Sequence, residues 1–154
     1  MRADRSYNIR TMREEDYDRV RALWESIDGL RLREIDDSRA GIGRFIRRNP
    51  TTSVVAEVDG EIVGTILCGH DGREGSLYHV CVAKPFREQG IGKAMVSRAM
   101  QALHREQINK LTLIAFKSND LGNGFWQGEG FQFREDINSY EVTLKREDLS
   151  SFDP

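Results

Sequence analysis

The sequence predicts a single α+β domain over residues 1–149, with a mixed, mostly antiparallel sheet of six to seven strands and about four helices. Two β-branched runs joined by Asp59-Gly60 are typical of a hairpin with a two-residue type I′ turn. A cluster of turn-forming residues at 70–75 joins this hairpin to the apolar run Ser76–Ala83 and predicts an antiparallel meander. A helical pattern followed by an apolar run at Lys110–Phe116 implies a βαβ step with a parallel strand pair.

The N-terminal part of the chain is expected to form one strand and two helices before the hairpin. Residues 7–12 alternate like a short strand, and the acidic residues after them suit the first turn of a helix, where carboxylates offset the helix dipole. Apolar residues recur at helical spacing along that helix: Tyr17, Val20, Leu23, Trp24 and Ile27. After a charged linker at 28–37, Ser38 is the expected N-cap of a second helix that ends at Asn49-Pro50.

The C-terminal part is expected to contain one long helix and one short helix. A continuous apolar face begins at Ile91 and predicts a helix that reaches about Glu106. Ser118 or Asn119 can cap a short helix further along, although the glycines in that helix disfavour the helical state.

Two segments near the C-terminus predict a last pair of strands, because residues 131–135 (FQFRE) and 139–144 (SYEVTL) alternate in the same way. The second would be an edge strand, whose unpaired N–H and C=O groups a second copy of the chain can cover. We therefore expect a homodimer. Residues 150–154 are expected to form a loose tail.

The composition argues against several classes of protein. The formal net charge of −2 disfavours a protein whose task is to neutralise nucleic-acid phosphates. No apolar run approaches the roughly 18 residues of a membrane span, and the first ten residues lack the apolar stretch of a signal peptide. The two cysteines, Cys68 and Cys81, are too few for a disulfide framework. The sequence therefore predicts a cytoplasmic protein without a nucleic-acid or membrane partner.

The stretch 86–95 (FREQGIGKAM) combines two glycines, which have no side chain, with the start of a predicted helix. Helix N-termini offer unpaired N–H groups and a partial positive charge, and glycines let an anion approach the backbone closely. The amides of residues 89–93 can therefore converge on a phosphate group, with Arg87 or Lys93 supplying charge. The stretch lacks the Gly-Lys-Ser/Thr of a nucleotide P-loop and the third glycine of the dinucleotide fingerprint. Taken alone, it is equally compatible with a tight strand-to-helix connection.

The wider context of this glycine loop resembles the acyl-CoA-binding motif of the GNAT superfamily of N-acetyltransferases, Arg/Gln-x-x-Gly-x-Gly/Ala. Residues 82–92 read V-x-x-P-F-R-x-x-G-x-G. Residues 9–20 look like the family's opening strand and helix, and residues 54–66 like its central hairpin. Residues 119–131 (NDLGNGFWQGEGF) look like its Asn-x-x-Ala-x-x-Phe-Tyr-x-x-x-Gly-Phe segment. The resemblance covers nearly the whole chain and is specific to the superfamily, though not to a substrate.

The resemblance implies a sheet that is splayed in the middle, with acetyl-CoA as co-substrate between the fourth and fifth strands. The pantetheine arm would pair with the backbone of Val80, Cys81 and Val82. The diphosphate would lie on the loop and the first helical turn: Arg87, Glu88, Gln89, Gly90, Ile91, Gly92 and Lys93. Asn119 and Trp126 are further expected contacts of acetyl-CoA. This placement agrees with what a CoA thioester needs, a dry slot for its arm and a helix N-terminus for its diphosphate.

Direct acetyl transfer to an amine requires a base, a donor for the oxyanion and a proton for the departing thiolate. Glu74, just before the fourth strand, resembles the base position of some relatives, and the Val80 amide is the expected oxyanion donor. At the position of the family's usual tyrosine acid this chain has Trp126, whose indole N–H is not released near neutral pH. We expect Trp126 to pack its helix onto the sheet. Tyr78, Tyr140 or water would then supply the proton.

Two further patterns have weaker functional interpretations. Cys68, His70, His79 and Cys81 would gather into a zinc site if residue 68 stood opposite residue 81. Half-buried strands often carry such residues without metal, so no metal is expected. The mixed-charge linker at 28–37 lies where the family places its acceptor groove, and a loop of that kind is usually a solvated face.

The sequence therefore predicts an acetyl-CoA-dependent N-acetyltransferase. Its acceptor would be a primary amine of a small molecule, of a peptide or protein N-terminus, or of lysine. The alternative is a non-catalytic acyl-CoA-binding or partner-docking module, because Trp126 replaces the usual acid and the chain has no assured base.

Overall fold

The computed structural model describes residues 6–144, which divide into two compact units. The first unit ends at Leu113 and contains the sheet, and the second begins at Ile114 and contains one helix. The predicted tail at 150–154 lies outside the described residues.

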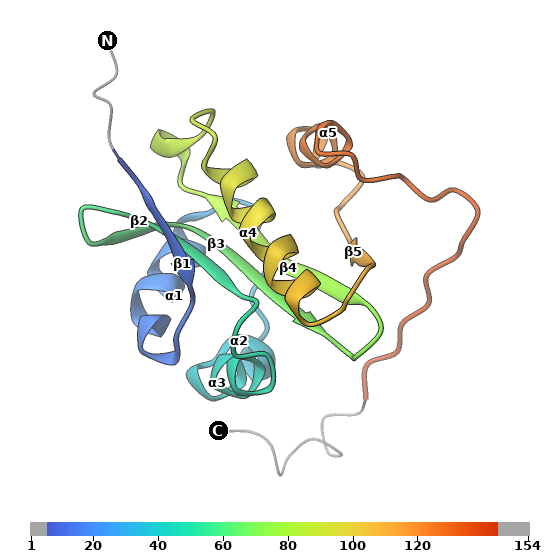
Figure 1. Cartoon of the computed structure of the whole chain (residues 1–154), viewed down its shortest axis with the longest axis horizontal. Coiled ribbons are helices and arrows are strands. Elements are labelled where there is room, and N and C mark those ends of the chain that lie inside the picture. Colours follow the sequence, from blue (N-terminus) through green and yellow to red (C-terminus); the bar gives the residue numbers. More distant parts are fainter. Residues whose placement is uncertain (1–5, 145–154) are drawn as a thin grey trace. The chain divides into compact units, whose positions relative to one another are not determined.

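The first unit is built around a mixed sheet with the strand order β1-β2-β3-β4-β5 (Figure 1). The strands are β1 Asn8–Thr11, β2 Val54–Val58, β3 Glu61–His70, β4 Gly75–Val82 and β5 Leu111–Leu113. The pairs β1–β2, β2–β3 and β3–β4 are antiparallel, and β5 is parallel to β4. The predicted α+β class, the meander and the βαβ step are therefore confirmed. The strand count is corrected, because the described residues form five strands rather than six to seven.

The β2–β3 hairpin turns at Asp59-Gly60, as its sequence predicts. Asp59 has φ 50° and Gly60 has φ 80°. Both central residues of a type I′ turn need positive φ, which glycine adopts without strain and aspartate tolerates better than most residues. The turn is thus determined by these two residues alone.

The helices of the first unit follow the predicted pattern with one addition. They are α1 Tyr17–Ser26, α2 Glu34–Asp37, α3 Arg39–Arg48 and α4 Ile91–Arg105, with 3-10 helices at Glu14–Asp16 and Lys84–Phe86. Ser38 caps α3 as predicted, because its hydroxyl accepts a hydrogen bond from the Gly41 amide at 3.1 Å. The addition is α2, which lies within the predicted linker. No helix among residues 6–144 has the length and apolar character that crossing a membrane requires.

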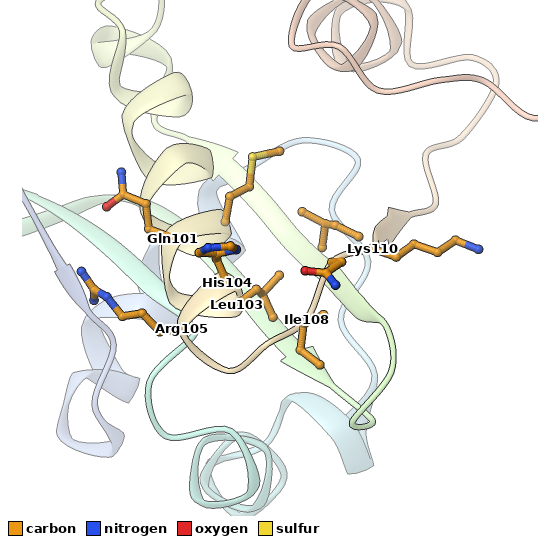
Figure 2. A pocket seen from close by; sticks show the side chains of 9 residues that line it. Gln101, Leu103, His104, Arg105, Ile108 and Lys110 are labelled. Carbon is orange, nitrogen blue, oxygen red and sulfur yellow. The ribbon is translucent and has the colours of Figure 1, made fainter.

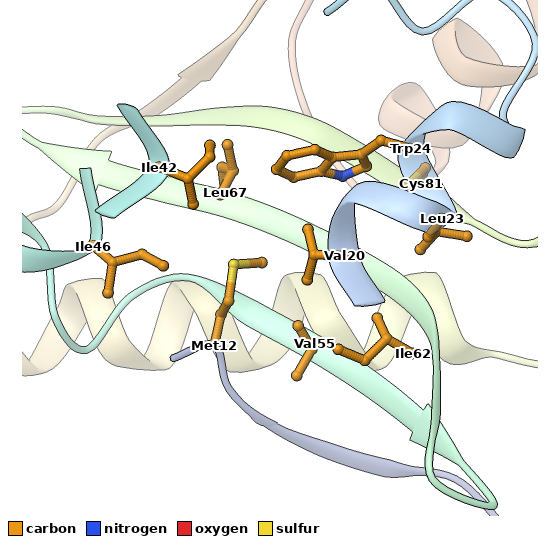
Figure 3. Close-up of a cluster of buried hydrophobic side chains, with 10 residues drawn as sticks. All are labelled: Met12, Val20, Leu23, Trp24, Ile42, Ile46, Val55, Ile62, Leu67 and Cys81. Carbon is orange, nitrogen blue, oxygen red and sulfur yellow. The ribbon is translucent and has the colours of Figure 1, made fainter. Parts of the chain in front are cut away.

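Helices cover both faces of the sheet in the first unit (Figure 1). On one face, α1 and α3 pack with the sheet into the buried cluster of Figure 3: Met12, Val20, Leu23, Trp24, Ile42, Ile46, Val55, Ile62, Leu67 and Cys81. On the other face, Met95 of α4 packs against Gly64 of β3. A Cβ at Gly64 would lie 2.9 Å from Met95 Cε, so this glycine allows the helix to approach the sheet closely.

The second unit contains α5, Asp120–Gly128. Asn119 is its N-cap, as one of the two predicted alternatives, because its side-chain oxygen accepts a hydrogen bond from the Gly122 amide at 3.0 Å. Trp126 of α5 packs edge to face with Phe125 and Phe131, at ring-centroid distances of 4.9 and 5.1 Å.

The predicted last strand pair is wrong for the described residues, because 131–144 contain no strand. Their alternation suits a strand, but a strand is stable only when its N–H and C=O groups pair with a neighbour. No such pairing is formed by these residues, and the side chains of Tyr140 and Val142 are 87% and 86% exposed. Residues 139–144 therefore do not provide the edge strand on which the expected homodimer was based.

Candidate active site

One side of β4 is open along the second half of the strand. β4 pairs with β5 only through Gly75, Ser76 and Leu77, whereas on its other side it pairs with β3 as far as Val82. Among the described residues, no strand pairs with 78–82 on the β5 side. The splay between the fourth and fifth strands is therefore confirmed, and it exposes the backbone edge that carries Val80, Cys81 and Val82.

A β-bulge interrupts the β3–β4 ladder at this open stretch. Thr65 pairs with Cys81 but Leu67 pairs with Tyr78, so β4 has one residue more than β3 between these pairs. His79, inside the bulge, has φ 48°, a left-handed conformation that is uncommon outside glycine. Bulges re-aim side chains and are frequent beside active sites. The bulge directs the His79 side chain toward α1 and α2 and places Val80, the expected oxyanion donor, next to it.

The bulge is held in place by the core. The Trp24 indole N–H donates a hydrogen bond to Thr65 Oγ1 at 2.9 Å, and Thr65 Oγ1 donates to the carbonyl of His79 at 2.9 Å. The rings of Trp24 and His79 meet edge to face at 4.8 Å. Because Trp24 is fully buried, the position of His79 depends on the packing of α1 on the sheet.

His79 forms a hydrogen bond with Asp37, a contact that the sequence does not reveal. His79 Nε2 lies 2.7 Å from Asp37 Oδ1, and the Asp37 carboxylate also accepts a hydrogen bond from the Arg33 amide at 2.6 Å. Burial by itself raises the pKa of Asp37, but the hydrogen bonds from His79 and the Arg33 amide outweigh it and lower that pKa below its ordinary value. Asp37 is therefore ionised at neutral pH although it is only 3% exposed.

The glycine loop forms the N-terminus of α4 and follows directly from β4. Gly90 is the N-cap with φ 84°, and no side chain caps the helix. The first amide of the helix with a backbone acceptor is that of Ala94, which donates to the Gly90 carbonyl at 3.0 Å. The amides of Ile91, Gly92 and Lys93 have no acceptor among the described residues, so they are free to bind an anion.

The other predicted residues of the loop surround these amides. The Arg87 guanidinium donates from Nε to the Val82 carbonyl at 2.9 Å, which ties the loop to the end of β4. The Gln89 side chain donates to the Pro85 carbonyl at 3.2 Å, and Glu88 has φ 62°. The structure thus brings the predicted cofactor residues of β4 and of the loop into one continuous segment.

Glu74 lies far from this segment. It is part of the β3–β4 turn, where its amide donates to Asp71 Oδ1 at 2.9 Å. The rise of about 3.3 Å per strand residue separates Glu74 from Val80 by roughly 20 Å. This placement does not support Glu74 as a base beside Val80.

Three predicted residues belong to the second unit. Asn119 caps α5, Trp126 is partly buried against its two phenylalanine neighbours, and Tyr140 is exposed in the segment without strands. Their expected contacts with acetyl-CoA and their catalytic roles stay predictions.

The register of the hairpin separates the cysteines of the zinc alternative. Cys68 pairs with Leu77, and Cys81 pairs with Thr65. Among residues 6–144, no three His, Cys, Asp or Glu side chains gather in a way that could hold a metal ion. Burial raises the pKa of the Cys68 thiol to about 12 and also raises that of Cys81, so both thiols stay protonated and unreactive at neutral pH.

A shallow pocket lies at the opposite end of α4 from the glycine loop (Figure 2). Leu103, His104 and Ile108 line it together with Lys110 and Leu111 at the start of β5. The 15 residues of α4, at about 1.5 Å per residue, place it roughly 22 Å from the loop. The pocket is therefore separate from the candidate active site.

Comparison with known proteins supports the assignment from fold and site. A model of the "Acetyltransferase (GNAT) family" matches residues 9–131. An acetyltransferase of Pectobacterium atrosepticum, ECA0875, is 37% identical over 119 residues, which are 77% of this chain and 83% of that protein.

Solved structures share the fold at lower identity. A PaiA N-acetyltransferase from Thermoplasma acidophilum in complex with coenzyme A has a TM-score of 0.73 and 18% identity, with 87% of this chain and 94% of that chain covered. An aminoglycoside acetyltransferase, meta-AAC0020, from an uncultured soil sample in complex with sisomicin has a TM-score of 0.68 and 18% identity, with 90% and 97% covered. Together with the family match, the splayed sheet and the glycine loop at the start of α4, these findings show that the chain belongs to the GNAT family of acetyltransferases.

Proposed function

We propose that the protein transfers the acetyl group of acetyl-CoA to a primary amine by direct attack within a ternary complex. The observation that carries this proposal is the open backbone edge of residues 78–82 beside the uncapped N-terminus of α4. The edge suits the amide groups of a pantetheine arm, and the amides of Ile91, Gly92 and Lys93 suit a diphosphate. The family model matches residues 9–131, which extend from the first unit into the second, and this supports their action as one catalytic domain.

The proposal assigns a donor to the oxyanion and a proton source to the departing thiolate. In this proposal the Val80 amide stabilises the oxyanion of the tetrahedral intermediate. Trp126 cannot supply a proton, and Tyr140 or water does so instead. A thiol with a pKa near 8.5 is a tolerable leaving group, so transfer does not require a tyrosine acid at the position of Trp126.

Turnover is the direct test of this function. We expect release of the CoA thiol when acetyl-CoA is mixed with one or more members of a panel of spermidine, sisomicin, lysine and a short peptide with a free N-terminus. Sisomicin is included because the structural neighbour described above binds it. Thiol release is followed with a chromogenic disulfide. Binding of acetyl-CoA without turnover on any panel amine would instead favour the non-catalytic binding module.

Replacing Gly90 with valine is expected to abolish acetyl-CoA binding. The side chain would cover the first-turn amides, and the φ of 84° would strain any L-residue by about 1–2 kcal/mol. At 100 times its Kd, acetyl-CoA stabilises the wild type by about 2.7 kcal/mol, which is read as a rise in Tm. The Tm of the variant should not rise.

Gly60→Val is the matched control for the backbone strain. Gly60 has φ 80° and nothing within 4 Å of the position of a Cβ, and a Cβ at Gly90 would make only an ordinary contact with the Tyr7 hydroxyl at 3.9 Å. Gly60 lies in the β2–β3 turn. It should lose similar stability and keep the full rise in Tm with acetyl-CoA. An unchanged rise in Gly90→Val would remove the loop from the binding site.

A further inference from the structure

We propose that His79 is the general base that takes the proton from the acceptor amine, and that Asp37 positions it. The inference rests on the proposed function and deepens it by assigning a residue to the deprotonation step. The observation that carries it is the buried carboxylate of Asp37, 2.7 Å from a histidine ring that the β4 bulge presents beside Val80.

The pair has the arrangement of a base with its orienting group. Ionised Asp37 accepts the Nε2–H of His79, which selects the neutral tautomer with a lone pair on Nδ1. Nδ1 has no hydrogen-bond partner among residues 6–144, and the His79 side chain is 20% exposed. The ring is therefore partly open to solvent, and its Nδ1 has no partner among the described residues that would compete with a substrate.

Asp37 is itself held firmly. Its carboxylate accepts from the Arg33 amide, and its carbonyl accepts from the Tyr17 hydroxyl at 2.7 Å and from Arg21 Nη1 at 3.0 Å. Two elements, α1 and α2, thus fix the carboxylate against the ring. Trp24 and Thr65 hold the other side of His79. A ring held on both sides loses little freedom when it accepts a proton.

A second histidine–carboxylate pair shows what distinguishes His79. His70 Nε2 lies 3.2 Å from Glu106 Oε2, but its Nδ1 accepts a hydrogen bond from the Gly72 amide at 3.0 Å. Both ring nitrogens of His70 are therefore engaged, and the pair lies at the far end of β3 from the bulge. His79 keeps one nitrogen for a substrate, whereas His70 does not.

The acceptor nitrogen loses two protons during the reaction, and each has a destination. The acceptor enters as an ammonium ion with a pKa near 10.4 and gives one proton to His79 Nδ1, which passes it to water. The free amine forms the N–C bond with the thioester carbonyl carbon, and the C–S bond breaks. The second nitrogen proton leaves to water as the amide forms, and the thiolate takes up one proton from water or Tyr140, which yields CoA thiol.

The charged and titratable neighbours of His79 come from three elements. α2 contributes Asp37, α1 contributes Tyr17 and Arg21, and β4 contributes Tyr78 and Cys81 beside His79 in sequence. β3 contributes only Thr65, which does not titrate. Asp37 is the carboxylate among these groups, so protonation of His79 creates an ion pair with it.

The decisive variant is His79→Asn, because asparagine tolerates the left-handed backbone but cannot take a proton. With the panel amine that the wild type acetylates fastest, kcat/KM should fall about 10²- to 10⁴-fold. The rise in Tm with acetyl-CoA should not change. With hydroxylamine, which is largely unprotonated at neutral pH, the loss should stay below about tenfold, because no deprotonation is needed.

The pH profile and two further variants complete the test. The variant's kcat/KM should rise tenfold per pH unit toward the pKa of the amine, whereas the wild type should reach a plateau. Asp37→Asn should lower kcat/KM with the alkyl amine more than with hydroxylamine, since Asp37 no longer positions the base. His70→Asn should behave like the wild type.

Three outcomes distinguish failure of the base assignment from failure of the proposed function. If His79→Asn acetylates the alkyl amine within about threefold of the wild type, His79 is not the base. An equal loss with the alkyl amine and with hydroxylamine would assign His79 a structural role and overturn the proposal. A wild type that acetylates no panel amine would contradict the proposed function itself, and the base assignment with it.

Discussion

Trp24→Ala should lower the free energy of unfolding by about 3–5 kcal/mol, measured by urea denaturation. The Trp24 ring is fully buried in the cluster of Figure 3, so the substitution leaves a cavity between α1 and the sheet. It also removes the indole N–H that donates to Thr65 Oγ1. Because Thr65 and Trp24 both contact His79, the variant should also lose acetyltransferase activity at temperatures where it is still folded.

Two substitutions serve as controls for this result. Trp24→Phe keeps most of the apolar volume and loses the hydrogen bond, so its cost should be clearly smaller than that of Trp24→Ala. Trp126→Ala should also cost less, because Trp126 is only partly buried in α5. Equal losses for Trp24→Ala and Trp126→Ala would contradict the assignment of Trp24 to the main core.

Asp16→Ala should destabilise the protein by about 3 kcal/mol, the lower end of the range for breaking a buried ion pair. The Asp16 side chain is 1% exposed, and its two oxygens bind the Arg10 guanidinium at 2.8 Å each. It also accepts hydrogen bonds from the Arg13 amide at 2.8 Å and from Arg19 at 2.9 Å. Removing the carboxylate leaves these donors without their partner. Glu57 still pairs with Arg10, which limits the loss.

The same carboxylate makes stability depend on pH. Burial alone raises the pKa of Asp16, but the hydrogen bonds from Arg10 and the Arg13 amide outweigh it and lower that pKa below the ordinary 3.8. The unfolded state therefore binds the proton first as pH falls. The stabilisation is complete above about pH 5 and is lost as pH decreases through the folded-state pKa.

Comparison with Asp16→Asn isolates the contribution of the Asp16 carboxylate to the pH dependence of stability. The difference in unfolding free energy between wild type and Asp16→Asn should be constant from pH 5 to 8 and should shrink below pH 4. A difference that stays constant down to pH 2.5 would show that Asp16 keeps an ordinary pKa in the folded protein.

Features that depend on local chemistry were predictable from the sequence. The Asp59-Gly60 turn, the Ser38 cap and the glycine loop each require a residue type at one position, because the backbone or a nearby amide imposes it. The same local signals, taken in order along the chain, indicated the α+β class and the family.

The predicted last strand pair shows that the alternation of residues within a segment does not by itself predict a strand. Residues 131–144 have the alternation of strands, yet a strand also needs a neighbouring backbone, which is a property of the whole fold and not of the segment. The strand predicted at Lys110–Phe116 is shorter for the same reason: β5 ends at Leu113, where its pairing with β4 ends at Leu77.

By itself, the sequence determined the β2–β3 turn, the cap of α3, the order of the strands β1 to β5 and the loop suited to a diphosphate. Only the tertiary structure decided that His79 meets Asp37. The two residues are 42 positions apart, and their spacing carries no motif. Their contact arises because the bulge turns His79 out of the strand register while packing of Trp24 on the sheet brings α1 and α2 against it. Contacts of this kind are set by long-range packing, which the pattern of neighbouring residues does not encode.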